Sequence, residues 1–319
     1  MDYGYLIKRS LEIVRKNRFL WALGVLALFA GGSTGFSGIN LNIPSGSSSQ
    51  DNEVMKSLTN RFSGTSGQSI CDALSPYWPV IIFLIFVLIF IGLLFLYLGY
   101  SAKAGLIYSA NSIEEKEEKQ SFGHAFHFGR EYFWRLFGLN LLVGLIIFGV
   151  FLVSAGVIAG LLFINHSIPM IVLAVILGIT AILFLALLGF FLKFGVILAE
   201  REIVIKNGRI IASLKTGCRV FRQNISKVLL AWLISVGLAI AYSFVLFFAL
   251  FVVCLLLVGI GLLFYFLTHL VGVIIYSVVV FLALMIALFC LSGVVNAYFS
   301  SYWTLAYRAL SKNLTKNTG

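Results

Sequence analysis

Charged residues are scarce in this chain, at 11% of 319 residues, whereas soluble domains average about 25%. Hydrophobic residues make up 61%, and the mean hydropathy is +1.03. A water-soluble globule of this size could not bury so much apolar surface, because its exposed shell must be largely polar. The composition therefore argues against a soluble enzyme, a nucleic-acid-binding protein and a disordered chain, and it indicates an integral membrane protein.

Cysteine is also scarce, and the four residues Cys71, Cys218, Cys254 and Cys290 form no Cys-x-x-Cys pair. Only Cys71 is predicted to lie on the outer side of the membrane, so the predicted topology offers no disulfide within the outer loops. Cys254 and Cys290 fall within predicted spans, where a thiol serves as a small apolar packing residue.

Recognisable catalytic patterns are missing as well. No Ser–His–Asp set, phosphate-cradling glycine loop or Walker motif can be placed, and no Asp, Glu or Arg falls in the centre of a predicted span. Ionisable groups inside the membrane are the usual mark of proton relays and coupled transporters. We therefore expect no enzyme, no cofactor and no proton-coupled pump.

Long runs without charge locate the membrane spans. No Asp, Glu, Lys or Arg occurs in 78–102, 136–192 or 228–307, and a spanning helix needs about 20 apolar residues. The first run holds one span, at Pro79–Tyr100. The second holds two spans separated by a turn at Asn165–Pro169, and the third holds two separated near Gly259–His269. A shorter span from Phe19 toward Gly38 brings the predicted total to six.

Two features of these spans stay open. Leu262–His269 either belongs to the turn between the last two spans or forms a partly re-entrant segment. Gly156 and Gly160 in the third span form a Gly-x3-Gly pair, a spacing that is typical of close helix packing in membranes.

The basic residues lie on one side of the predicted spans. Every Lys and Arg except Lys56 and Arg61 falls in a segment of that side, and those two lie in the outer loop at about 38–78. The positive-inside rule therefore predicts a multi-pass protein of the cell membrane with both termini in the cytoplasm. The net charge of +11 is then a basic belt facing an anionic leaflet, and membrane lipids rather than nucleic acid are the expected partners.

A cleaved signal peptide is the alternative interpretation of residues 1–32, because Leu28-Phe-Ala30 loosely resembles a cleavage site. Against it, the region that precedes the apolar core is long, contains Glu12 and is itself amphipathic.

The chain repeats a unit made of an interfacial helix, a span, an outer loop and a second span. Lys103-Ala-Gly105-Leu-Ile matches Lys193-Phe-Gly195-Val-Ile where the second and fourth spans leave the membrane, and Tyr302-Trp-Thr304-Leu-Ala is a weaker third copy. We predict one membrane domain, 1–319, with repeat units at about 1–110, 111–200 and 201–310. The expected fold class is all-α, with six transmembrane helices in three helix pairs.

Three cytoplasmic amphipathic helices precede the odd-numbered spans, and an amphipathic basic helix of this kind lies in the headgroup plane. Phe122, Phe126 and Phe133 define the apolar face predicted for the second of them. The first and third carry the residues predicted to contact lipid headgroups: Lys8, Arg9, Arg15, Lys16, Lys215, Arg219 and Arg222. Packing against the ends of the spans is a second interpretation of all three helices, and it is compatible with the first.

Few other residues are candidates for a site. His124, His127 and Glu131 share a sector of the second amphipathic helix and form a weak candidate metal site; solvated side chains are the simpler interpretation, and no metal is predicted. Asn140 and Asn296 are the only amides expected inside the spans.

The stretch Leu198–Gly208, together with Ala212–Leu214, Phe221–Asn224 and the aromatic ending Tyr302–Arg308, resembles a large group of prokaryotic six-span proteins. That group is similar to the membrane domain associated with some glycerophosphodiester phosphodiesterases. The resemblance implies the six-span layout only. Phosphodiesterase chemistry resides in a separate soluble barrel, and no segment of this chain is long or polar enough to form one.

These observations predict a non-enzymatic membrane module that contacts lipids or binds a partner, either another membrane protein or a second copy of the chain. A transporter or channel for a small or lipid-like solute is the alternative, because internal repeats and frequent glycines are common in transporters. A membrane enzyme that uses the His124–Glu131 cluster is a third hypothesis.

Overall fold

The structure is a computed structural model, and it describes residues 1–30, 78–116, 120–164 and 168–316. These residues are helical almost throughout and contain no strand. The helices are α1 (Tyr3–Lys16), α2 (Phe19–Ala27), the 3-10 turn η1 (Leu28–Ala30), α5 (Trp78–Lys116), α6 (Phe122–Glu131), α7 (Phe133–Ile164), α8 (Ile168–Lys206), α9 (Ile210–Gln223) and α10 (Ile225–Lys316).

Five stretches of helix are long and apolar enough to cross a membrane: Trp78–Glu115, Phe133–Leu161, Val172–Lys206, Ile225–Leu262 and Ile274–Ser311. The expectation of an all-helical chain with several helices capable of spanning a membrane is therefore confirmed for the described residues. The first predicted span is represented by Phe19–Ala30, which is shorter than a span. The outer loop and the turn at residues 165–167 lie outside the described residues, and the backbone of Leu262–His269 is helical.

The chain divides into two compact units. The larger unit consists of Met1–Phe36 and Leu98–Gly319, and the smaller one of Ser37–Tyr97. In the smaller unit the described residues are the first part of α5, whose apolar side chains are largely exposed.

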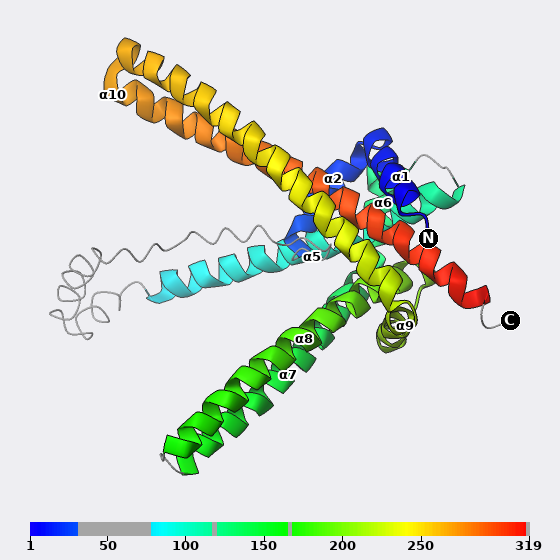
Figure 1. Cartoon of the computed structure of the whole chain (residues 1–319). Coiled ribbons are helices and arrows are strands. Elements are labelled where there is room, and N and C mark those ends of the chain that lie inside the picture. The colour runs from blue at the N-terminus through cyan, green and yellow to red at the C-terminus, as the bar shows by residue number, and fades with distance from the viewer. Residues whose placement is uncertain (31–77, 117–119, 165–167, 317–319) are drawn as a thin grey trace. The chain divides into compact units, whose positions relative to one another are not determined.

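The spans of the larger unit run in antiparallel pairs. Helices α7 and α8 lie side by side, as do the two halves of α10 (Figure 1). The Tyr276 hydroxyl donates to the Leu257 carbonyl at 3.0 Å, which ties the two halves of α10 together. Most large apolar side chains on these pairs are exposed, as expected for helices that face lipid acyl chains.

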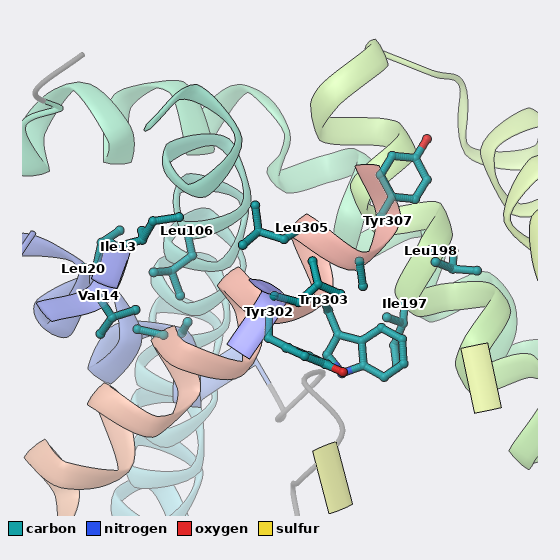
Figure 2. Packing of buried hydrophobic residues seen from close by; sticks show 14 of the residues in the cluster. Ile13, Val14, Leu20, Leu106, Ile197, Leu198, Tyr302, Trp303, Leu305 and Tyr307 are labelled. Carbon is teal, nitrogen blue, oxygen red and sulfur yellow. The ribbon is translucent and has the colours of Figure 1, made fainter. Parts of the chain in front are cut away.

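The hydrophobic core lies where the second helix of each pair ends. The C-terminal parts of α5, α8 and α10 contact one another there: Phe194 of α8 packs against Trp303 of α10, and Arg308 of α10 donates to Asn111 of α5 at 2.9 Å. Figure 2 shows Leu106, Ile197, Leu198 and the aromatic side chains of α10 meeting in this core. The close packing of these three ends is what positions the polar groups described below.

The shorter helices α1, α6 and α9 each cross one of these three ends. Helix α6 crosses α5, where a Cβ on Gly105 would lie 2.7 Å from the Ala125 carbonyl oxygen. Helix α9 crosses α8, where a Cβ on Gly217 would lie 2.5 Å from the Gly195 carbonyl oxygen. Helix α1 packs on α10 and buries Ser10. Small residues permit these close crossings because any larger side chain would meet backbone atoms.

Local sequence explains why α1 forms. The Asp2 carboxylate caps the helix by accepting from the Tyr5 amide at 3.1 Å. Leu6, Ser10, Ile13 and Val14 recur at helical spacing and form its buried face. Basic residues occupy the last turn, where the helix dipole favours positive charge.

Helix α2 packs on the last part of α10 through two glycines. A Cβ on Gly24 would overlap the Gly293 carbonyl, so the two backbones are in direct contact. The Asn296 side chain donates to the Gly24 carbonyl at 3.0 Å, close to the same crossing. Asn296, one of the two amides predicted inside the spans, thus joins two helices.

Candidate functional site

A cluster of charged side chains is buried in the core of the larger unit. Lys103 of α5 forms an ion pair with Glu200 of α8, and both side chains are almost completely buried, at 3% and 0% exposed. The Asn140 amide of α7 donates to the same carboxylate oxygen of Glu200 at 3.1 Å. One carboxylate therefore connects three helices.

Arg201 places a second cation beside Glu200. Its Nη1 lies 3.4 Å from the Glu200 carboxylate and donates to the Ile197 carbonyl at 2.7 Å. Among the described residues, Nε and Nη2 of this buried guanidinium have no hydrogen-bond partner. Two cations thus share one carboxylate, and Glu200 is the group on which the electrostatic balance of the core depends.

The predicted headgroup residues divide into two groups in the structure. Six of them point to the surface of α1 and α9: Lys8, Arg15, Lys16, Lys215, Arg219 and Arg222. The opposite faces of the same two helices are buried, at Ile13 and Val14 in α1 and at Val220 and Phe221 in α9. Each helix therefore presents positive charge on the side that does not pack against the core.

Arg9, the seventh predicted headgroup residue, belongs to a network instead. Its side chain is 22% exposed, and its Nε donates to the Glu114 carboxylate of α5 at 2.9 Å. Its Nη1 pairs with Glu12 at 3.1 Å, and the Tyr5 hydroxyl also donates to Glu114 at 3.0 Å. Hydrogen bonds to Lys16 and Arg9 lower the pKa of Glu12. Arg9 thus fastens α1 to α5 in addition to contributing positive charge.

A family model matches almost the whole chain. It describes a family of unknown function, DUF7544, and its match covers residues 9–315. The chain belongs to this family. No match was found among curated proteins or among solved structures. The resemblance to the membrane domain associated with glycerophosphodiester phosphodiesterases accordingly stays a prediction.

The two span amides of this DUF7544 member have different roles. Asn140 contacts the buried charges, since it bonds to Glu200 as well as to the Leu136 carbonyl of its own helix at 3.0 Å. Asn296 belongs to the contact between α2 and α10. The structure therefore brings one of them, Asn140, into the charged cluster.

The candidate metal residues of this DUF7544 member lie on the exposed side of α6. His124 bonds through Nδ1 to the Gln120 side chain at 3.1 Å, and its ring lies 6.1 Å from that of Tyr108. In the part of the chain that the structure describes, no group of three or more His, Cys, Asp or Glu side chains could hold a metal ion. His124, His127 and Glu131 therefore do not form such a group.

Sequence analysis did not identify Lys103, Glu200 and Arg201 as a site. Lys103 was visible as the residue that ends a charge-free run, and Glu200 and Arg201 lie within the stretch that carries the family resemblance. One signal pointed to them: Glu200 and Arg201 continue the fourth apolar helix without an intervening turn residue. Their burial depends on the contact between α5 and α8, which local sequence does not encode.

Proposed function

We propose that this protein is a non-enzymatic membrane module that binds anionic lipid headgroups on its cytoplasmic side. It would lie in the cell membrane with six spans, counting the one that begins at Phe19, and with both termini in the cytoplasm. The observation that carries this proposal is the pair of basic faces on α1 and α9, each lying opposite a buried apolar face.

The position of these faces relative to the spans supports the proposal. Helix α1 is followed within three residues by α2, and α9 within two residues by α10, so both basic faces lie beside the start of an apolar helix. Basic side chains at that depth lie near the lipid phosphates, where each contributes about 1 kcal/mol of attraction to an anionic leaflet. Six exposed cations on two helices give a surface that favours anionic over zwitterionic lipid.

Lipid preference tests the proposal. The purified chain is mixed with phosphatidylglycerol and phosphatidylcholine, and the lipids that remain bound are counted by native mass spectrometry. Reversing three charges in α9 (K215E, R219E and R222E) should lower the preference for phosphatidylglycerol at least about tenfold. A variant that keeps the charges, K215R with R219K and R222K, is the matched control. An unchanged preference after charge reversal would overturn the proposal.

The predicted repeat is consistent with this arrangement. Helices α6 and α9 cross the end of the preceding unit, and α1 crosses the end of the last unit, so the same contact would occur three times around the core. We propose that the three repeat units close into a ring in this way, with the amphipathic helices on its cytoplasmic face. Mutual contact of α5, α8 and α10 in the core supports this proposal.

A transporter or channel for a lipid-like solute is the second candidate function. Its support is a groove of about 350 Å³ between the two halves of α10, lined only by Leu, Val and Ala side chains such as Leu250, Ala283 and Leu288. Liposomes that hold fluorescent phospholipid in one leaflet would reveal transport as movement to the other leaflet. Flux that is lost when Ala283 is enlarged to Phe would support this function.

The exposed apolar spans also leave room for a partner within the membrane. Either another membrane protein or a second copy of the chain would bury side chains such as Phe247 and Phe281. Measurement of molecular mass in a mild detergent distinguishes a monomer from a homo-oligomer.

A further inference from the structure

The start of α7 and the end of α8 meet at one level of the membrane. The span Phe133–Leu161 begins where α7 begins, and the span Val172–Lys206 ends where α8 ends. Helices α7 and α8 lie side by side and antiparallel (Figure 1). Residues just before the first span and just after the second therefore lie at the same water–membrane boundary.

Two contacts fix the geometry of this boundary. The Arg135 guanidinium donates through Nη1 to the Asn207 side-chain oxygen and, at 3.4 Å, to the Asn207 carbonyl. Asn207 has a φ of 58°, so the chain turns sharply between α8 and α9. One turn along α7, Gly138 faces Ile210, where a Cβ on the glycine would lie 3.0 Å from Ile210 Cδ1. The backbone of Arg209, which lies between Asn207 and Ile210 in the chain, is consequently held beside the start of α7.

The two segments that meet here carry positive charge and an exposed indole. Arg209 and Lys206 are exposed, and Trp134 in the first turn of α7 is 74% exposed. The acidic neighbours are Glu202, which pairs with Lys206 at 3.3 Å and accepts from the Tyr307 hydroxyl, and the exposed Glu131. The bonds from Arg135 to Asn207 use Nη1 only. No acidic neighbour is therefore bonded to either arginine in the interactions described at this boundary.

The first turn of α9 follows Arg209 directly and supplies backbone and hydroxyl donors. This turn contains no acidic residue, and Arg209 at the cap position makes no side-chain capping bond. Its amides therefore lack a negative partner. Independently, the Ser213 hydroxyl is buried, at 2% exposed, and has no hydrogen-bond partner among the described residues. It points at the loop, because a Cβ on Gly208 would overlap it.

We propose that this corner, formed by Trp134, Arg135, Arg209 and the first turn of α9, binds the phosphate of one anionic phospholipid. Arg135 and Arg209 contact the phosphate from two sides, because guanidinium groups match phosphate oxygens in geometry and charge. Trp134 lies against the glycerol and carbonyl region of the same lipid, the level that indole rings prefer in membranes. The site rests on the proposed function only in requiring an anionic leaflet on this side.

The proposed phosphate site predicts that one bound phospholipid is lost selectively when the site is changed. The chain is purified with phosphatidylglycerol, washed with detergent and examined by native mass spectrometry at increasing salt. We expect one lipid to resist washing, and Arg209→Gln should weaken its retention about five- to tenfold. The Arg209 side chain is exposed and makes no capping bond, so thermal stability should stay unchanged in this variant. Arg135→Lys keeps a donor for Asn207 and should weaken retention less.

A matched variant separates this site from the basic faces. Arg219→Gln with Arg222→Gln removes two charges from the α9 face and should leave the tightly held lipid in place. If Arg209→Gln and the Arg219→Gln/Arg222→Gln variant lost the tightly held lipid equally, the lipid would be held by diffuse charge attraction. That result would overturn the proposed corner site and leave the proposed function intact. We expect the Arg219→Gln/Arg222→Gln variant to lose preference for phosphatidylglycerol but to keep the one tightly held lipid.

Free phosphate is the competing ligand. Inorganic phosphate at millimolar concentration should not displace the lipid, because it makes no contact through glycerol or acyl chains. Displacement by inorganic phosphate, or retention of the lipid after Trp134→Ala at the wild-type level, would overturn the assignment to a phospholipid.

Discussion

Lys103 and Glu200 form an ion pair in the buried core although they lie 97 residues apart in the sequence. The pair joins α5 to α8, and Asn140 adds α7 through the same carboxylate oxygen. Because Arg201 lies beside it, Glu200 is, among the described residues, the one carboxylate paired with both buried cations. The three polar partners of one carboxylate therefore hold three spans in register.

Neutralising Glu200 should destabilise the protein more than removing Lys103. Glu200→Gln leaves Lys103 and Arg201 buried without a counter-charge, and breaking a buried pair in this way costs about 3–5 kcal/mol. Lys103→Met leaves Glu200 balanced by Arg201, so we expect a smaller loss. Thermal unfolding in detergent, followed by loss of helical circular dichroism, measures both effects.

Lys193 provides the control for this comparison. It occupies the position that matches Lys103 in the predicted repeat, but its side chain is exposed. Lys193→Met should change the unfolding temperature little. A larger loss for Lys103→Met than for Glu200→Gln would contradict the charge balance that the structure shows.

Gly24 should not accept a side chain. A methyl group there would overlap the Gly293 carbonyl, and backbone of α10 cannot move away as a flexible side chain could. Gly24→Ala should therefore separate α2 from α10 and lower the stability by about 1–3 kcal/mol. Gly237→Ala is the matched control, because no atom lies within 4 Å of a Cβ added there; we expect it to be neutral or slightly stabilising. Equal effects of the two substitutions would be inconsistent with this contact.

The sequence pattern predicted the long helical segments well, because a long run without charged residues is itself the mark of a helix that can span a membrane. The amphipathic patterns of α1 and α9 are local features that one segment reveals by itself. The predicted turn at residues 165–167 lies outside the described residues, and the backbone near His269 is helical instead of forming a turn. The buried face of α6 was harder to predict from the sequence. The pattern favoured Phe122, Phe126 and Phe133, and the structure does bury Phe133. Within α6 it buries Ala125 and Gly129 and leaves Phe122 exposed, because α6 crosses α5 too closely for a large side chain.

The site could not be predicted from the sequence because it depends on contacts between residues that are far apart in the chain. In the sequence, Lys103 looks like any cation at the end of a span, and only the contact between α5 and α8 shows that it is buried beside Glu200. Arg135 likewise looks like any interfacial arginine, and only the structure shows its bond to Asn207. Glycine spacing was similarly ambiguous. Gly156 and Gly160 show the Gly-x3-Gly pattern, but a Cβ at either position would meet no atom within 4 Å, whereas Gly24, which has no such partner, lies at a backbone contact.

Acid should weaken the ion pairs that Glu12 makes within α1. Lys16 lies 2.5 Å from this carboxylate and Arg9 lies 3.1 Å from it, and their hydrogen bonds lower the pKa of Glu12 below its ordinary value. A lowered pKa in the folded state stabilises the protein above the ordinary pKa of Glu, and that contribution is lost as the pH falls through the lowered value. The carboxyl carbon of Glu12, followed by NMR, should titrate below a free Glu. A normal titration, or one unchanged by Lys16→Met, would contradict the pairing.

Labelling of two cysteines tests the orientation of the chain. An impermeant maleimide applied to intact cells should label a variant that keeps only Cys71 and should spare one that keeps only Cys218, because the basic segments predict α9 on the cytoplasmic side. In permeabilised cells Cys218 should react slowly at neutral pH. It packs against Gly195, where a Cβ would lie 2.8 Å from its Sγ, and burial raises the pKa of this thiol, so less of the reactive thiolate is present. The rate at which the maleimide labels Cys218 should rise with pH. It should reach the rate of a free thiol once the protein is unfolded. Labelling of Cys218 but not Cys71 in intact cells would reverse the predicted topology.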